Sequence, residues 1–308
     1  MIPFLEPVEH FGLRFDRGSI LFEFDALREP ERTQFPQIGH YLRARGVEFN
    51  EVPTPQMLWR GKLWPDLFIA NQLEAAPEGW NVGDIWDGQF HPDQKFRWRD
   101  SLSLWHASVL NHGEKFHDAF IEPMVRKIAG RASSEIAAKF HRSIWMPIFW
   151  PTTLRSRKSI PTKFHYPKHG YAGCVADLVQ SGSARAIPRT QPAIHKEMDG
   201  VAISVAYCLA HPLQTFSVAF IVDDSPIYRV TDQEVCAGID APLHRLIVEY
   251  RGECDVWNEL QRLGLADAKQ VAYGSARLQL PTLANVKAGW TPRPHINAQL
   301  WEIINGQK

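Results

Sequence analysis

Three segments in the middle of the chain decide the fold: F-I-E-P-M-V-R-K-I-A-G at residues 120–130, S-S-E-I-A-A-K-F-H-R-S-I-W-M-P-I-F-W-P-T-T-L at residues 133–154, and F-H-Y-P-K-H-G-Y-A-G at residues 164–173. The first lies in a run, residues 114–129, whose apolar side chains recur at four-residue spacing, which is typical of a helix. Pro123 inside that run predicts a kink or a break, because proline cannot donate a helical hydrogen bond. The region therefore predicts consecutive helices separated by proline stops.

The segments that follow predict two further helices. Ser133 can cap the first of them, whose apolar face ends before Pro147. The second predicted helix begins with residues 171–180, after the Tyr-Pro-Lys turn. Upstream, residues 35–45 carry helical spacing and stop at Gly46, a residue suited to a left-handed C-cap.

Strand patterns flank this helical middle. Residues 13–24 predict one strand. Residues 201–222 carry no formal charge and are long enough to span a bilayer, but their alternation and Pro212 favour two strands joined by a loop. Residues 243–250 predict another strand, and residues 255–263 predict a helix that ends at a glycine. Strands and helices mix without steady alternation, which predicts an α+β fold with a mixed sheet.

Charge and cysteine content narrow the class of protein. The 308 residues hold 34 Lys plus Arg and 34 Asp plus Glu, so global charge steers the chain toward neither nucleic acid nor an anionic membrane. The four cysteines are scattered and form no C-x-x-C pair, which argues against a disulfide framework and a zinc site. The N-terminus has no basic region followed by an apolar run, so we expect a cytoplasmic protein without a signal peptide or a membrane span.

Tryptophan is concentrated in one part of the chain, because eight of the 11 tryptophans lie between residues 59 and 150. One interpretation is a cleft that grips a flat or sugar-containing ligand by stacking, with Trp64 against the substrate. The other is that these rings form the core of a region with little regular structure. The sequence leaves both open.

The order of these features resembles the flavin-dependent oxidoreductases of the amine oxidase, protoporphyrinogen oxidase and UDP-galactopyranose mutase kind. Residues 11–23 are similar to the segment that passes close to the flavin in that superfamily, and residues 144–173 are similar to the end of its helical substrate domain. The likeness covers most of residues 11–300 and lies in order and spacing. It implies a helical substrate-binding domain joined to an incomplete FAD/NAD(P)-binding-like scaffold.

The dinucleotide fingerprint of that superfamily is missing. In G-x-G-x-x-G the glycines let the backbone reach a pyrophosphate at a helix N-terminus, and no such sequence occurs in this chain. Members of the superfamily also carry a middle and a glycine-rich C-terminal flavin-binding segment. This chain is abbreviated between Gln191 and Thr215 and ends at Lys308 without the second of them, so we expect weak or absent flavin affinity for the isolated chain. Three explanations stay open: a substrate-binding subunit whose cofactor half is a separate protein, a truncated product of a longer gene, and a relative that has lost flavin.

The resemblance implies three regions. Residues 1–50 would be a remnant of the flavin-domain scaffold, residues 51–180 a helical Trp-rich substrate-binding region, and residues 181–308 a mixed-sheet substrate domain with a C-terminal helix. The expected function is the substrate-binding part of an FAD-dependent oxidoreductase that moves a hydride from a small molecule to the flavin, with FAD bound only together with a dinucleotide-binding partner protein. The alternative is a non-catalytic small-molecule-binding or assembly protein derived from the same family.

Position in the resemblance also implies two sets of site residues, none of them assigned as catalytic. The residues expected beside the flavin are Arg14, Asp16, Gly18 and Ser19. The residues expected to face the substrate are Trp64, Tyr166, Lys168, Tyr228 and Arg229. The alternative for Arg14 and Asp16 is an exposed strand pair, and the alternative for the two tyrosines is half-buried packing.

Other patterns argue against rival chemistries. Four histidines match neither H-E-x-x-H nor a Cys/His pattern, so we expect no metal and assign them to helix surfaces: His106, His112, His117 and His141. The nucleophile motif G-x-S-x-G is absent, which argues against a hydrolase. The basic run at residues 155–158 has two interpretations, a grip on a phosphate or carboxylate and a solvated loop.

Overall fold

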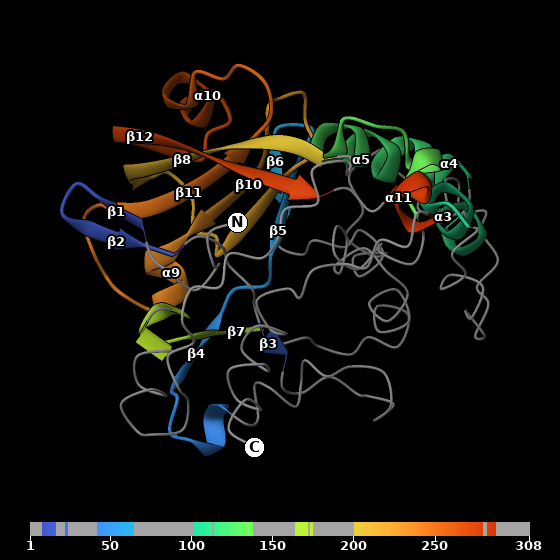
Figure 1. The fold of residues 1–308 in the computed structure, drawn as a ribbon. Coiled ribbons are helices and arrows are strands. Elements are labelled where there is room, and N and C mark those ends of the chain that lie inside the picture. The colour runs from blue at the N-terminus through green and yellow to red at the C-terminus, as the bar shows by residue number, and fades with distance from the viewer. Residues whose placement is uncertain are drawn as a thin grey trace.

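A mixed seven-stranded sheet dominates the part of the chain that the computed structural model describes, namely residues 8–16, 22–23, 42–64, 102–112, 114–137, 164–171, 173–174, 200–279 and 282–287 (Figure 1). The strand order is β12-β8-β11-β10-β9-β5-β6. The strands are β5 (Gln56–Trp59), β6 (Lys62–Trp64), β8 (Gly200–Pro212), β9 (Val218–Ile221), β10 (Ile227–Asp232), β11 (His244–Tyr250) and β12 (Ala266–Gln279). Neighbours pair antiparallel, except that β5 runs parallel to β9.

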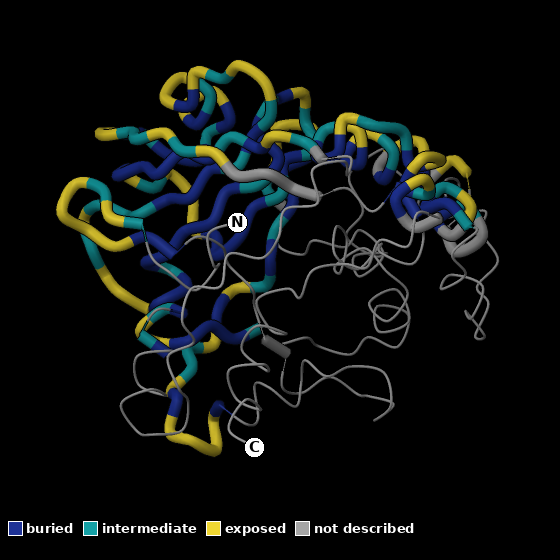
Figure 2. The backbone as a smooth tube through the Cα atoms, viewed as in Figure 1, coloured by how far each residue is buried: buried dark blue, intermediate teal, exposed yellow. Residues whose placement is uncertain are grey.

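Both faces of this sheet are covered, because successive residues of a strand point to opposite sides. Residues 206, 208 and 210 of β8 belong to a core that Val256 and Leu260 of α10 (Val256–Arg262) complete. Residues 205, 207 and 209 belong to a second core, together with Met124 and Val125 of α5 (Glu122–Ala129). Figure 2 shows the buried residues running along the strands between these two layers. Each fully buried aliphatic side chain contributes roughly 1.5–3 kcal/mol, so the sheet is the main source of stability.

The apolar run at residues 201–222 forms two strands, as the alternation and Pro212 predicted. β8 ends at Pro212 and β9 begins at Val218. The strand predicted at residues 243–250 is confirmed by β11. None of the described helices is long and apolar enough to cross a membrane.

The helix predicted at residues 255–263 is also confirmed, by α10. It begins where the carboxylate of Asp255 accepts the backbone N–H of Asn258 at 3.2 Å, and Gly264 follows it with a φ of 66°. An acceptor side chain at the start and a glycine after the end are the expected stops of a short helix.

The helical layer consists of α3 (Leu104–His112), α4 (Glu114–Phe116), a π-helical segment η3 (His117–Ile121) and α5. The break predicted from Pro123 is confirmed, because the helix changes to π geometry just before it and α5 carries the proline in its first turn. Gly130 ends α5 in the left-handed conformation, with a φ of 64°.

The prediction that a helix begins at Ser133 is wrong. Residues Ser133–Glu135 form only a short 3-10 turn, η4, and Ile136 is extended with φ −87° and ψ 136°. Ile136 bridges Thr282, just before α11 (Leu283–Lys287), and its carbonyl accepts the backbone N–H of Leu104 at 2.7 Å. Ile136 is extended because its backbone bonds with residues far away in the sequence are incompatible with the helix that the apolar spacing predicts. The rest of the predicted helix lies outside the described residues.

A smaller three-stranded sheet has the order β3-β7-β4, with β3 at Phe22–Glu23, β7 at Phe164–Pro167 and β4 at Phe49–Val52. A separate hairpin joins β1 (Val8–His10) to β2 (Leu13–Phe15). Within the strand predicted at residues 13–24, the described residues form β2 and β3, which belong to different sheets. The helix predicted at residues 35–45 is described only near its end, where Gly46 has a φ of 84°.

The short helix α9 (Gln233–Ala237) joins the two sheets. It follows β10 directly and contacts β4 and β7. The side-chain amide of Asn50 in β4 donates to the carbonyl of Ala237 at 2.5 Å. Helices combined with mixed sheets confirm the α+β class. The division at residues 50 and 180 stays a prediction, although β5 and β6 belong to the same sheet as the strands beyond residue 200.

Candidate functional site

The two segments that the resemblance places beside the flavin and the substrate lie in contact. The phenol of Tyr166 in β7 donates to the carboxylate of Asp16, 150 residues earlier, and the backbone N–H of Tyr171 donates to the same oxygen at 3.1 Å. Asp16 is 8% exposed and Tyr166 is 1% exposed. Burial, followed by the charge of Asp16, raises the pKa of Tyr166 well above its ordinary value, so the phenol is a neutral donor.

Glycine favours this contact at position 170. The φ of Gly170, +70°, lies in the left-handed region, and a Cβ atom there would stand 2.7 Å from a carboxylate oxygen of Asp16. Any other residue at this position would strain the backbone and push against Asp16 where the Tyr-Pro-Lys turn closes over it. Residues 170, 171, 173 and 174 are helical, as predicted for the segment after the turn.

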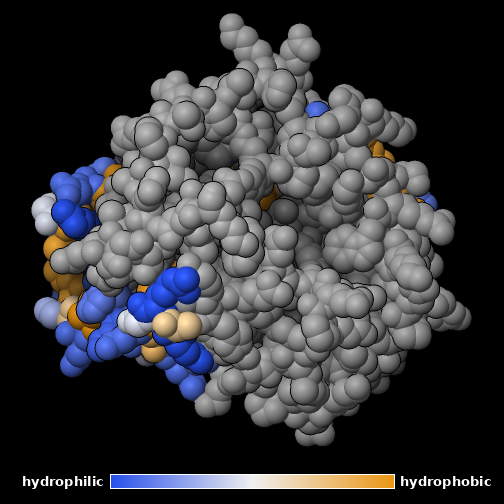
Figure 3. Space-filling model, turned by 60° about the horizontal axis from the view of Figure 1, so that its bottom comes forward, coloured by the Kyte–Doolittle hydropathy of each residue, from blue (hydrophilic) through white to orange (hydrophobic). Residues whose placement is uncertain are grey.

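The remaining residues expected beside the flavin do not join Asp16. Arg14 is exposed and pairs with Glu9 across the hairpin at 3.3 Å, while its carbonyl accepts a bond from the guanidinium of Arg245. Gly18 and Ser19 lie outside the described residues. On the flank where the hairpin lies, Figure 3 shows hydrophilic and hydrophobic side chains next to one another.

Lys168 lies at the surface of the three-stranded sheet. Its ammonium pairs with Glu48 at 2.6 Å, and the two side chains are 49% and 65% exposed. The hydrogen bond from Lys168, followed by its charge, lowers the pKa of Glu48. Trp64 ends β6, but its side chain lies outside the described residues.

Tyr228 and Arg229 point to the same face of the large sheet because of a β-bulge. The register between β10 and β11 shifts between Ile227 and Arg229, which leaves Tyr228 as the extra residue. Tyr228 packs in the core beneath α5, and Arg229 pairs in register with Glu249, which itself pairs with Val205 of that core. A regular strand would have sent these two neighbours to opposite faces.

Glu249 holds Arg229 through both carboxylate oxygens. Nη2 of Arg229 donates to Oε1 of Glu249 at 2.7 Å, and Nε donates to Oε2. The side chains are 26% and 13% exposed. Burial by itself would lower the pKa of Arg229, but the charge and hydrogen bond of Glu249 reverse this effect and raise it. Burial also raises the pKa of Tyr228 well above its ordinary value.

Aromatic rings continue this face toward Asp16. The ring of Tyr207 in β8 lies 5.5 Å from Phe15, the residue before Asp16, and 4.8 Å from His10. Phe15, Tyr207 and Tyr228 belong to one core cluster. The candidate site is therefore the sheet face with Tyr207, Tyr228 and Arg229, against which Phe15 packs, together with the contact between Asp16 and Tyr166 that begins at the next residue of the chain.

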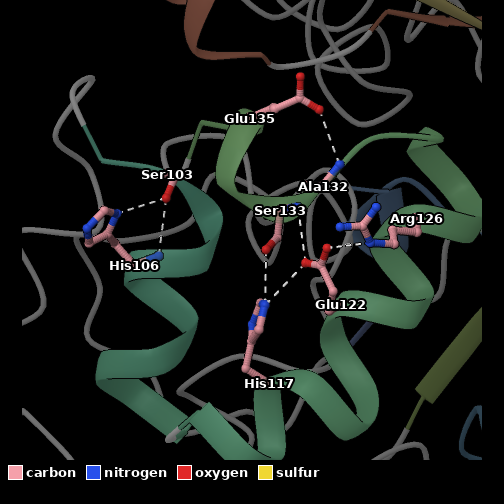
Figure 4. Close-up of polar contacts among 8 residues, drawn as sticks. All are labelled: Ser103, His106, His117, Glu122, Arg126, Ala132, Ser133 and Glu135. Carbon is pink, nitrogen blue, oxygen red and sulfur yellow. Dashed lines mark hydrogen bonds and ion pairs between the residues drawn. The ribbon is translucent and has the colours of Figure 1, made fainter.

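The helical layer also holds a polar cluster that no sequence pattern predicted (Figure 4). His117 was expected at a helix surface, but its side chain is fully buried. Its Nε2 atom lies 3.0 Å from Oγ of Ser133 and 3.3 Å from Oε2 of Glu122. Only the helical periodicity around residue 117, which marks an inward position, could have indicated its burial. His106 is exposed, as predicted.

This cluster has the residue types of a hydrolase triad but a different geometry. In a triad the serine and the carboxylate occupy different ring nitrogens, so that the proton passes through the imidazole. Here Ser133 and Glu122 share Nε2 of His117. Among the described residues, no group of three or more metal-ligating side chains comes together.

No family model matches the sequence, and no curated protein matches it significantly. Solved structures do match. A UDP-galactopyranose mutase in its reduced form superposes with a TM-score of 0.59 at 14% identity, over 92% of this chain and 77% of that chain. A protein described as a protoporphyrinogen oxidase, from Exiguobacterium sp. 255-15, gives 0.53 at 12% identity, over 98% and 82%.

A protein from Pyrococcus furiosus gives a TM-score of 0.50 at 11% identity, over 88% of this chain and 79% of that one. At identities this low, the TM-scores show a likeness of fold alone. The protein thus has a fold similar to those of a UDP-galactopyranose mutase and of a protein described as a protoporphyrinogen oxidase, two of the kinds of protein that its sequence resembles.

Proposed function

We propose that this chain is the substrate-binding part of an FAD-dependent oxidoreductase and that a separate dinucleotide-binding partner supplies the cofactor. The observation that carries the proposal is the bond between Asp16 and Tyr166. It joins the segment expected beside the flavin to the segment expected at the substrate. The contact between these two segments supports a shared site.

The described residues do not fit the pyrophosphate of FAD. The carboxylate of Asp16 already accepts bonds from Tyr166 and Tyr171, and Arg14 lies exposed against Glu9. This misfit, together with the missing glycine fingerprint, is why the proposal assigns the dinucleotide to a partner. FAD would supply the hydride acceptor, and the organic chemistry belongs to the cofactor.

The chain's own residues would bind and orient the substrate. Arg229 presents a planar guanidinium that Glu249 holds in one orientation, and Tyr228 lies on the same face. Held groups orient a ligand without losing conformational freedom during binding. Asp16 acts as a positioning residue, because it fixes Tyr166 and the turn that follows.

The test is purification of the tagged full-length chain from the organism that encodes it, with visible absorbance and mass spectrometry of the complex. We expect a yellow complex with a protein that carries G-x-G-x-x-G, in which a small-molecule substrate bleaches the flavin under anaerobic conditions. In that complex Arg229→Lys should raise KM, because lysine lacks the guanidinium fork. Arg131→Gln, at a partly exposed arginine that pairs with Glu135 outside the candidate site, should not.

A second function is favoured by the same contacts. The polar groups of Asp16, Lys168 and Arg229 all have partners within the chain, as in a protein that uses them for structure alone. This alternative is a non-catalytic small-molecule-binding or assembly protein. A colourless chain that folds and binds a ligand without any partner would establish it and would overturn the oxidoreductase proposal.

A further inference from the structure

His117 stands where three helical segments meet. It is the first residue of the π-helical segment, and its ring lies edge-on to Trp105 of α3 with centroids 6.4 Å apart. Its Nε2 atom contacts Ser133 of η4 and Glu122 of α5 (Figure 4). One imidazole therefore links α3, α5 and η4. π-helical segments often mark functional positions.

The two ring nitrogens of His117 have different surroundings. Because Glu122 is an acceptor, Nε2 carries the proton of the neutral ring. Nδ1 is buried and makes no hydrogen bond to the protein. Oγ of Ser108, on the buried side of α3, also makes none. A proton added to Nδ1 would enter a buried position without an acceptor, which is unfavourable.

The charges around the ring only partly compensate for this. The titratable and charged groups on the surrounding elements are His106 and His112 on α3, Glu114 and Lys115 on α4, Asp118 on η3, Glu122, Arg126 and Lys127 on α5, Glu135 in η4 and Arg131 just before it. Burial lowers the pKa of His117, and this outweighs the opposite effect of Glu122, Asp118 and Glu114. Glu122 is itself engaged by Arg126 at 2.7 Å and by the backbone N–H of Ser133 at 3.1 Å.

We propose that His117 is a built-in acid switch: its protonation opens the junction of α3, η3 and η4 and loosens the helical cover of the sheet. The open form exposes the ring and lets both nitrogens reach water. The closed form holds the neutral ring between Ser133 and Glu122. Met124 and Val125 follow Glu122 in α5 and pack in the core cluster that contains Tyr228. Opening of the junction therefore changes the access of small molecules to the sheet face on which Tyr228 lies.

The sign follows from proton linkage. A histidine whose pKa is lower in the closed form binds fewer protons there than in the open form, so acid favours opening. In the open form, where water reaches the ring, His117 should have the ordinary histidine pKa of about 6.5. If the ring stays neutral in the closed form, the equilibrium constant for opening rises by up to about tenfold as the pH falls from about 7.5 to about 5.5.

Hydrogen–deuterium exchange of the full chain tests this, after correction for the pH dependence of intrinsic exchange. Peptides that cover residues 103–112 and 131–137 should show the rise. His117→Gln should abolish it, because the glutamine amide can still donate to Glu122 but does not titrate. His106→Gln, a change at an exposed histidine of α3, should leave it intact.

A rise of the same size in the His117→Gln variant would overturn the proposal. A second measurement covers the case in which that variant does not fold. The ring protons of His117, followed by NMR in the unmodified protein, should titrate below the ordinary pH range of histidine. A midpoint near 6.5 or above would also overturn it.

Discussion

Lys127 is a buried cation whose effect on stability depends on pH. From α5 its ammonium donates to the carbonyl of Ile221 at 2.8 Å and to that of Asp223 at 2.6 Å, at the end of β9. Burial lowers the pKa of Lys127 from 10.5 to about 8, although the charges of Asp223, Asp224 and Glu259 oppose the change. The helical layer is thus fastened to the sheet by a lysine that loses its proton easily.

The magnitude follows from that pKa. Each pH unit of difference is worth about 1.36 kcal/mol, so moving from 10.5 to about 8 represents about 3.4 kcal/mol against the charged folded form. Between these two values the unfolded chain binds more protons than the folded protein, so stability rises with pH. From about pH 7 to about pH 9 the gain from Lys127 alone is about 1.3 kcal/mol.

Urea unfolding of the wild type and of Lys127→Met, each at about pH 7 and about pH 9, measures this gain. The wild type should become more stable relative to the variant by about 1.3 kcal/mol as the pH rises. Methionine leaves two carbonyls without a donor, which lowers the free energy of unfolding of the variant by the same amount at both pH values. This loss therefore cancels when the two pH values are compared. Lys269→Met, at a 43% exposed lysine paired with Asp267, should show no such change. A difference of zero or of opposite sign for Lys127→Met would refute the reasoning.

Three further sets of substitutions test the candidate site by urea unfolding. Gly170→Ala should destabilise by about 1–3 kcal/mol more than Gly12→Ala, because both positions have positive φ but only Gly170 lacks room for a Cβ atom; equal losses would contradict the close approach. Asp16→Ala and Tyr166→Phe should each lose about 1–3 kcal/mol, and the double variant should lose less than their sum, since both changes remove the bond between Tyr166 and Asp16; strict additivity would show that the bond contributes nothing. Glu249→Gln should cost about 1.5–3 kcal/mol, because it breaks a partly buried charged pair, and a loss under about 0.5 kcal/mol would place that pair effectively in solvent.

Local patterns predicted several elements correctly because the forces that form them act within a few residues. The cap at Asp255 and the glycine after it delimit α10, and Pro123 breaks the helix where expected. The alternation in β8 separated its two faces and excluded a single membrane helix. Near Ser133 the local pattern predicted a helix wrongly, because Ile136 forms its backbone contacts with Leu104 and Thr282, which lie far away in the sequence.

The candidate site shows the same division. Position in the resemblance pointed to Asp16, Tyr166, Tyr228 and Arg229, but not to their partners. The bulge that turns Tyr228 and Arg229 to one face depends on the register against β11, which pairing across the sheet determines. The burial of His117 depends on the packing of α3 and η4 around it.

By itself the sequence determined the α+β class, the breaks at proline and glycine, and the neutral charge that disfavours nucleic acid, because composition, periodicity and backbone stereochemistry act locally. Only the tertiary structure decided that β5 pairs parallel with β9, that Asp16 bonds Tyr166, and that Nδ1 of His117 is buried without a protein partner. Those features depend on contacts between residues far apart in the chain, whose distances and solvent exposure exist only once the sheet and its helical cover have assembled.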